Sequence, residues 1–240
     1  MRWYLMKYIP KKEMDFKEPI VITGFPGMGL VGNIAAHKIA KDLNLDFVGY
    51  FDSPEVPPIM AVEEGILYPP IRVYANENMI VIYSEVLIPQ KSVYELADEI
   101  MNYIGTKNPK ILINLDGITS LNPKKTYMVS ASENMLKSME HENIEILDFG
   151  MAGGLAGIIT VRCGDKDIPS VCLMAETNGL RPDPKGASNL ITILNEIYNL
   201  DVNTEDLLKE DKAIKEKLKK LAEEQMKLLS KQKVENPMYM

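Results

Sequence analysis

Short apolar runs alternate with helical patterns along residues 1–202. Several runs are apolar at nearly every position, as Ile80-Val81-Ile82 and Ile111-Leu112-Ile113 show. Such runs are typical of strands that are buried on both faces, in a sheet covered by helices on two sides. The predicted strands are Arg2–Ile9, Pro19–Thr23, Phe47–Phe51, Ile71–Tyr74, Met79–Val86, Lys110–Leu115, Ile144–Leu147 and Ser170–Ala175.

Three longer segments place apolar residues at helical spacing, which predicts helices over Leu30–Leu43, Ser92–Ile104 and Ala187–Leu200. Ser92 and Glu95 stand at the spacing of a capping box at the start of the second helix. The third helix has Asp183 as its expected N-cap and Pro184 at its first position. Strands that alternate with helices in this way predict a layered α/β domain.

The sequence changes character after Asp201. Leucine or isoleucine recurs at every seventh position, and the segment is otherwise dominated by charged residues and alanine; the repeat consists of Leu207, Ile214, Leu221 and Leu228. Polar residues at Asp211 and Gln225 interrupt the second apolar stripe that a coiled coil needs. We therefore expect an amphipathic helix that folds against its own domain or against a neighbouring subunit. The predicted parts are an α/β body at 1–202, a charged helical arm at 203–232 and a flexible docking tail at 233–240.

The charge and hydropathy of the chain indicate which classes of partner to expect. The chain has a net charge of −7 and no basic block, whereas a nucleic-acid surface needs clustered Lys and Arg, so we expect no nucleic-acid partner. No apolar run approaches the roughly 20 residues that span a bilayer, so we expect no membrane partner. The first ten residues lack the apolar core of a signal peptide, and the sequence therefore predicts a cytoplasmic protein.

The two cysteines, Cys163 and Cys172, flank the polar stretch Gly164–Asp167. If that stretch closed a simple hairpin between two short strands, the cysteines would be out of register for a disulfide. We expect two buried thiols that are not bonded to each other.

A glycine-rich motif follows the strand at Pro19–Thr23. Its Gly27, Gly29 and Gly32 match the G-x-G-x-x-G pattern that lets pyrophosphate approach a helix N-terminus, and Asp52 stands twenty residues after the last glycine. The alternative function that follows is a nucleotide- or nucleoside-binding enzyme or sensor. The complete motif is Gly24-Phe25-Pro26-Gly27-Met28-Gly29-Leu30-Val31-Gly32.

Two observations weaken that alternative. Pro26 removes one N–H from the turn, and a proline-rich loop, 52–58, takes the place of the expected crossover helix. The competing interpretation is that small residues such as Gly24 and Gly32 let the helix pack closely on its strand.

Candidate chemistry elsewhere is sparse. Asp116, Asp148 and Glu176 follow strands, where α/β enzymes place their reactive groups, and Gly150–Gly157 resembles a second glycine loop. No spacing singles out an acid–base pair, a metal cluster or a catalytic triad, and no ATPase phosphate loop is present. The sequence therefore predicts a protein that is not an enzyme, with no catalytic residues, no metal and no cofactor.

Three separated motifs resemble the archaeal homologues of proteasome assembly chaperones, of the second-chaperone type. They are the Gly24–Gly32 motif, Gly153-Gly154-Leu155 and Pro182-Asp183-Pro184, and the resemblance covers roughly residues 15–205. It implies a three-layer α/β sandwich with a mostly parallel sheet, similar to nucleoside phosphorylases, without established catalysis. It also implies a homo-oligomer whose partner is the proteasome core particle.

The last three residues, Met238, Tyr239 and Met240, resemble the hydrophobic-Tyr-X motif that enters pockets between proteasome α-subunits. A free terminal carboxylate can pair with a lysine in such a pocket, and Tyr239 offers an apolar ring with a hydroxyl group. We therefore predict that several tails dock together on the α-ring. The protein would then act as an assembly chaperone or as an activator that is independent of ATP. The sequence leaves both outcomes open.

Overall fold

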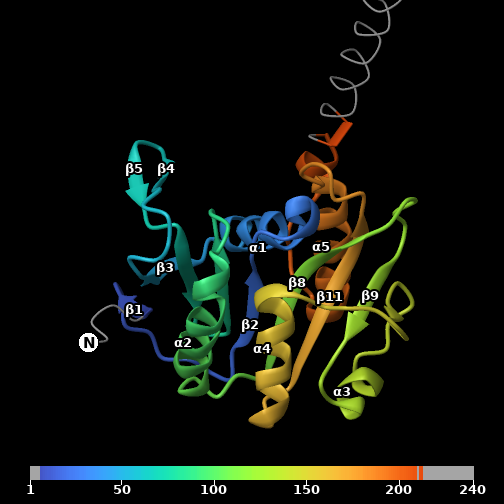
Figure 1. The fold of residues 1–240 in the computed structure, drawn as a ribbon, viewed down its shortest axis with the longest axis horizontal. Coiled ribbons are helices and arrows are strands. Elements are labelled where there is room, and N and C mark those ends of the chain that lie inside the picture. The colour runs from blue at the N-terminus through green and yellow to red at the C-terminus, as the bar shows by residue number, and fades with distance from the viewer. Residues whose placement is uncertain (1–5, 210, 213–240) are drawn as a thin grey trace, which may run out of the picture.

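A nine-stranded sheet forms the centre of the computed structural model, which describes residues 6–209, 211 and 212 (Figure 1). In spatial order the strands are β1 (Lys7–Pro10), β3 (Asp46–Asp52), β6 (Ile71–Asn76), β7 (Met79–Ser84), β2 (Ile20–Gly24), β8 (Ile111–Thr119), β11 (Ser170–Thr177), β9 (Thr126–Val129) and β10 (Glu145–Ile146).

The central strands β7, β2, β8 and β11 are parallel to one another. On one side β6, β3 and β1 continue the sheet in antiparallel order, and on the other side β9 is antiparallel to β11 and parallel to β10. The tight turn between β6 and β7 has only two residues between the strands, which permits antiparallel pairing alone. The α/β fold with a parallel sheet is confirmed, with antiparallel strands at its flanks.

Helices cover both faces of the sheet and make three layers. One face packs against α1 (Val31–Asp42) and α5 (Pro184–Tyr198), and the other against α2 (Val93–Gly105) and α4 (Gly154–Asp165), which lie side by side in Figure 1. Neighbouring residues of one strand serve opposite layers: Ile22 packs with α1 and α5, and Val21 with α2 and α4. This explains why the central strands are apolar at consecutive positions.

Further elements complete the chain. A two-stranded sheet of β4 (Ala61–Glu63) and β5 (Ile66–Tyr68) follows β3, and a short helix α3 (Glu133–Ser138) follows β9. Two 3-10 turns, η1 (Met28–Leu30) and η2 (Gln90–Ser92), precede α1 and α2. No helix of the described part of the chain is long and apolar enough to cross a membrane.

All three predicted helices are present, and each predicted strand overlaps an observed one. The expected N-cap of α5 is confirmed, because the Gly186 N–H donates to Asp183 Oδ1 at 3.0 Å. The capping box at α2 is wrong: Ser92 makes no capping hydrogen bond, and its Oγ is buried without a partner among the described residues. The preceding turn η2 holds Ser92 in a helical conformation, which is not the extended geometry that an N-cap needs.

The predicted hairpin between the cysteines is also wrong. Cys163 lies in α4 and Cys172 in β11, so the intervening turn joins a helix to a strand. The β-branched residues 158–161 favour a strand locally, but α4 buries one side on the sheet, and this packing outweighs the local preference. The expectation of buried thiols that form no disulfide is confirmed, since both cysteines are buried and free.

The start of the arm lies against the body. Leu207, the first residue of the sevenfold repeat, is buried in the same apolar cluster as α1 and α5. Lys38 of α1 binds Asp42 at 2.9 Å and Asp206 at 2.6 Å, which fixes this segment to the helix. The rest of the predicted arm lies outside the described residues, and the division of the chain at residue 203 stays a prediction.

Glycines let α1 approach the sheet closely. A Cβ atom on Gly32 would overlap the backbone carbonyl of Leu115 in β8, and one on Gly24 would overlap the backbone of Gly32. We predict that Gly32→Ala lowers the free energy of unfolding by roughly 1–3 kcal/mol, because α1 must move away from the sheet. Chemical denaturation measures the difference.

Gly105→Ala is the matched control, because a Cβ atom at that helical position meets nothing within 4 Å. It should leave stability unchanged or raise it by about 0.5–1 kcal/mol. If the two substitutions changed the free energy of unfolding equally, the close approach of α1 to the sheet would not contribute to stability.

Candidate functional site

A pocket of about 580 Å³ lies beside the glycine loop. Its walls come from the loop after β2, the second half of β8 and the first turn of α4; they comprise Phe25, Pro26, Gly27, Met28, Leu115, Asp116, Gly117, Ile118, Thr119, Met151, Gly153, Gly154, Leu155 and Ala156. After β2 the chain enters α1 on one face of the sheet, whereas α4 covers the other face. The pocket therefore lies at a topological switch point, where open α/β sheets place their ligands.

The glycines of the loop serve close packing. Gly29 has a left-handed φ of 63°, and a Cβ atom there would press on the Thr177 side chain of β11. A Cβ atom on Gly27 would overlap Asp116 Oδ1. The Asp183 N–H donates to the Gly29 carbonyl at 2.8 Å and ties the loop to the start of α5. These contacts support the interpretation that the motif is a packing device.

Asp116 places a carboxyl group directly against Gly27. Burial raises the pKa of Asp116 to about 6, although the Gly117 N–H donates to its Oδ1 at 2.8 Å and acts in the opposite direction. Above that pH the group is an anion, which repels a phosphate at the position where a dinucleotide loop would bind one. Sequence reasoning noted Asp116 as a carboxylate after a strand but did not connect it with the glycine loop.

Asp52 does not join this site. It ends β3, which is separated from β2 by β6 and β7, and it is exposed. In a dinucleotide-binding fold the acid ends the strand next to the glycine loop, where it reaches the ribose. The residues after β3, 53–60, contain no helix, as the proline-rich loop predicted.

A buried row of hydrogen bonds holds α4 against the pocket. Thr23 Oγ1 donates to Asn114 Oδ1 at 2.6 Å, and Asn114 Nδ2 donates to Thr160 Oγ1 at 2.9 Å. Thr160 Oγ1 in turn donates to the Ala156 carbonyl at 2.8 Å. These bonds link β2, β8 and α4, so the first turn of α4, with Gly153 and Gly154 in the second glycine stretch, has a fixed place at the pocket.

Two further polar residues, Glu176 and His141, have separate roles. Glu176 Oε2 accepts the N–H groups of Lys124 and Lys125, at 2.8 and 3.0 Å, and fixes the loop before β9. His141 Nε2 lies 3.1 Å from Glu196 of α5. Neither lies with Asp116 in the pocket.

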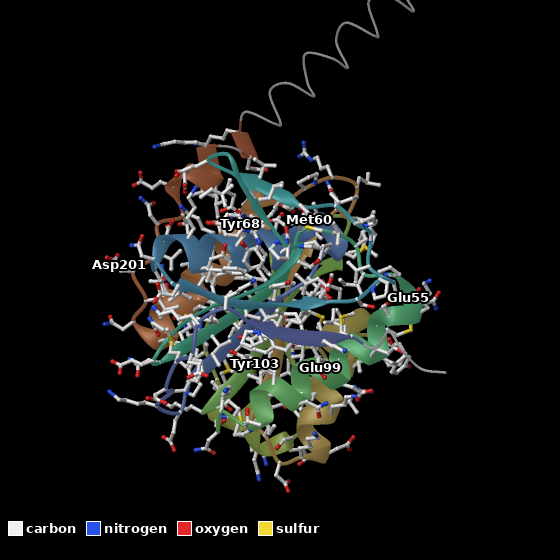
Figure 2. The ribbon with its side chains drawn as sticks, turned by 90° about the vertical axis from the view of Figure 1, so that its left-hand side faces the viewer. Glu55, Met60, Tyr68, Glu99, Tyr103 and Asp201 are labelled. Atoms are coloured by element: carbon white, nitrogen blue, oxygen red, sulfur yellow. The ribbon has the colours of Figure 1, made fainter. Side chains whose placement is uncertain are left out.

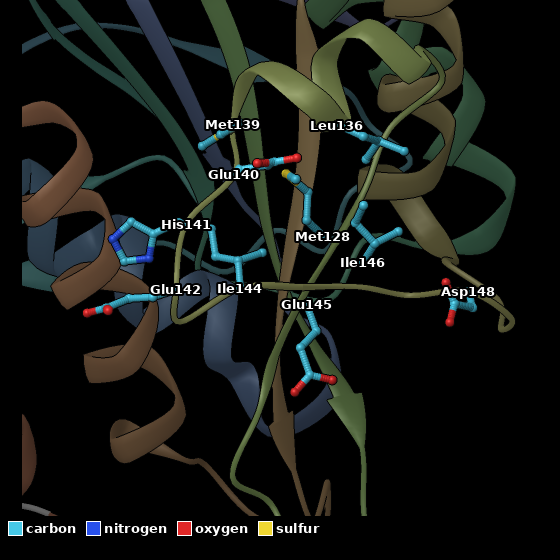
Figure 3. A pocket seen from close by; sticks show the side chains of 10 residues that line it. All are labelled: Met128, Leu136, Met139, Glu140, His141, Glu142, Ile144, Glu145, Ile146 and Asp148. Carbon is cyan, nitrogen blue, oxygen red and sulfur yellow. The ribbon is translucent and has the colours of Figure 1, made fainter.

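A second pocket of about 600 Å³ contains Asp148 (Figure 3). Met128, Met139 and Ile144 give it an apolar part, and carboxylates are distributed around it at Glu140, Glu142, Glu145 and Asp148. Figure 3 shows the ring of His141 to one side, away from Met128. His141, which also lines this pocket, pairs with Glu196 of α5, which is not among the lining residues.

A polar cluster surrounds Arg72 of β6, whose side chain is 0% exposed. Its guanidinium donates to Glu63 of β4 and to Glu85 after β7, each at 2.5 Å. His37 of α1 stacks on Tyr83 and approaches Glu85 to 3.9 Å, and burial lowers its pKa. His37, Glu63 and Glu85 could together approach a metal ion, but the guanidinium already pairs with both carboxylates. His37, Glu63, Arg72 and Glu85 are far apart in the sequence, so the sequence did not indicate that they form a cluster.

The predicted docking residues, Met238, Tyr239 and Met240, lie outside the described residues, and their role stays a prediction.

Comparisons with known proteins agree over nearly the whole chain. The model of the PAC2 family matches residues 21–222. An uncharacterized protein of Methanocaldococcus jannaschii is 42% identical over 98% of each chain. The crystal structure of Pyrococcus furiosus PbaA, described as an archaeal homolog of proteasome-assembly chaperone, is 33% identical and covers 95% of this chain and 96% of its own, with a TM-score of 0.84.

A more distant solved structure shares the fold. Pyrococcus furiosus PbaB, described as an archaeal proteasome activator, is 17% identical, with a TM-score of 0.80 over 91% of this chain and 99% of its own.

The raised pKa of Asp116 predicts a pH-dependent stability. Because the folded-state pKa of about 6 lies above the ordinary value of 3.8, stability falls as the pH rises from about 4 through about 6. Asp116→Asn removes this cost, so at pH 7–8 the variant should be more stable than the wild type by up to about 3 kcal/mol. Urea denaturation between pH 4 and 8 measures this, and a stability difference that is independent of pH would contradict the assignment.

Proposed function

The chain belongs to the PAC2 family, and on this basis we propose that it is a non-catalytic, proteasome-binding protein of the assembly-chaperone or activator type. The observation that carries the proposal is the likeness to PbaA, which combines 33% identity with a TM-score of 0.84 over 95% of the chain. PbaB, which has the same fold, is described as an activator, so both outcomes remain in the proposal. A proteasome partner is consistent with a cytoplasmic location.

The proposed contact is the docking of C-terminal residues into pockets of the α-ring. The carboxylate of Met240 pairs with a basic group, the ring of Tyr239 fills a small pocket, and Met238 adds flexible apolar contact. A segment as short as 238–240 binds weakly, because it must be ordered on docking and contributes few contacts. Several tails on one homo-oligomer raise the overall affinity by a factor of about 10² to 10⁴.

The pocket beside the glycine loop supports the non-catalytic part of the proposal. It contains one carboxyl group, Asp116, and otherwise mostly apolar side chains and glycines. Among the residues that the structure describes, no second titratable side chain lines this pocket to act as a partner acid or base. Around the buried Arg72, Glu63 and Glu85 pair with the guanidinium, and the partly exposed His37 stacks on Tyr83 and approaches Glu85 to 3.9 Å, which gives these side chains a structural role.

We predict that removal of residues 238–240 abolishes co-sedimentation with archaeal proteasome α-rings and leaves the number of subunits in the oligomer unchanged. Tyr239→Ala should have most of the same effect, because it removes the ring that anchors the tail. The matched control is Val234→Ala, in the predicted tail but outside its last three residues, which should bind as the wild type does. Native mass spectrometry of each protein with α-rings reports binding and oligomer mass together, and binding that survives the truncation would refute the tail mechanism.

The alternative function, a nucleotide- or nucleoside-binding enzyme or sensor, has the pocket volume in its favour. Asp116 and the distant Asp52 oppose it, so we expect neither ATP nor adenosine to raise the melting temperature. A saturable rise that is lost in Gly29→Ala would support the alternative, because a side chain at φ 63° would disturb the loop.

A further inference from the structure

The pocket beside the glycine loop, which we call the glycine-loop pocket, contains a carboxyl group that no basic side chain neutralises. Asp116 lies half-buried on β8, and the Gly117 N–H donates to its Oδ1 at 2.8 Å. Its Oδ2 has neither a hydrogen-bond partner nor an ion pair in the part of the chain that the structure describes. Every other described side chain that lines the pocket is uncharged. The carboxylate would therefore be stabilised by a cation that the described residues do not supply.

The walls of the pocket are apolar and become more exposed at its mouth. Phe25, Leu115 and Leu155 are buried lining residues, whereas Met28 and Met151 are 52% and 93% exposed. The volume of about 580 Å³ is in the range of pockets that hold small ligands. These walls, together with one carboxylate, suit a group that has an apolar stem and a positively charged end.

The mouth of the pocket is accessible to a partner. The projecting β4–β5 hairpin follows β3, and Figure 2 shows Met60 and Tyr68 in its region. In the order of the sheet, β6 and β7 separate β3 from β2 and β8, whose ends form the pocket. The hairpin therefore does not cover Met28 and Met151, which agrees with their exposure.

Lysine and arginine side chains have the required composition. Their stems pack along apolar surface while the charged end reaches a polar partner. Asp116 repels a phosphate, and a purely apolar side chain would remove water from the carboxylate without replacing the lost hydrogen bonds. A basic side chain has neither disadvantage.

The start of α4 adds a second requirement. Its N-cap residue, Gly153, makes no side-chain hydrogen bond, and N–H groups in the first turn of a helix need an acceptor from outside the helix. In a pocket that already contains the carboxylate of Asp116, an uncharged carbonyl oxygen suits this position better than an anion. A peptide carries such carbonyl groups next to its side chains. A basic residue within a peptide segment therefore satisfies both requirements.

We propose that the glycine-loop pocket binds a lysine or arginine side chain from a peptide segment of a protein partner. The charged end pairs with Asp116, the stem lies along the apolar walls, and apolar neighbours in the segment contact Met28 and Met151. This site lies on the body of the protein and does not use residues 238–240. The inference thus goes beyond the proposed docking of the C-terminal tail.

Methyl NMR tests the pairing at the pocket itself. The full-length protein is labelled at its methionine methyl groups and titrated with the peptide acetyl-Leu-Lys-Leu-amide. The Met28 and Met151 signals are identified from the variants Met28→Leu and Met151→Leu. We expect both signals to shift with saturation, at weak affinity because the peptide is short. The matched peptide has norleucine in place of lysine, which keeps the stem without the charge, and it should bind roughly tenfold more weakly.

Asp116→Asn should lower the affinity for the lysine peptide to that for the norleucine peptide, because the substitution removes the charge and keeps the shape. The control variant is Asp148→Asn, which removes an exposed carboxylate of the second pocket and should bind the lysine peptide as the wild type does.

The binding should also depend on pH. Between pH 7.5 and pH 5 the affinity of the wild type for the lysine peptide should fall roughly tenfold, because Asp116, with a pKa of about 6, becomes mostly protonated. The other described titratable group that interacts with Asp116 is the Cys172 thiol of β11. Burial raises the pKa of that thiol, so it stays uncharged over this range.

Three results would overturn the proposal. They are equal affinity for the lysine and norleucine peptides, binding that survives Asp116→Asn, and no shift of the Met28 and Met151 signals. A protein without residues 238–240 should bind the lysine peptide as the full chain does. The pocket and the tail are thus tested by different measurements, and either proposal can fail without the other.

Discussion

The direct contact between α1 and the backbone of β2 and β8 is the constraint on which the centre of the molecule depends. Gly24 and Gly32 remove the side chains that would separate helix and strands, so the carbonyl of Leu115 lies where a Cβ atom would be. Since α1 is held this close, the loop before it must turn sharply, with Gly29 at positive φ. The turn leaves space next to the first turn of α4, and this space is the glycine-loop pocket.

The G-x-G-x-x-G pattern thus has a physical explanation without a phosphate. The three glycines permit a sharp turn and a helix that packs closely on the sheet, and dinucleotide sites need the same two features. The charge of the pocket distinguishes this loop from a dinucleotide-binding loop, because Asp116 places a negative charge opposite Gly27 at neutral pH. The pocket consequently suits an apolar occupant with little negative charge.

A buried arginine connects the body with the β4–β5 hairpin, which carries exposed apolar residues. Arg72 lies in a strand of the main sheet and pairs with carboxylates from the hairpin and from the loop after β7. A buried charge is costly unless it is paired, so the two ion pairs of Arg72 favour one position of the hairpin, while its Nε has no hydrogen-bond partner among the described residues. The fold in this way combines a fixed projecting hairpin and a pocket.

The sequence by itself determined the layered α/β fold, the central strands and the helices α1, α2 and α5, because apolar periodicity reports which faces are buried. It also indicated that the glycine loop is a packing device. Only the tertiary structure showed that residues 154–165 form a helix, that Asp116 faces Gly27, and that Arg72 anchors the hairpin. These features depend on contacts between residues that are distant in the chain, for which local propensity and spacing carry no signal.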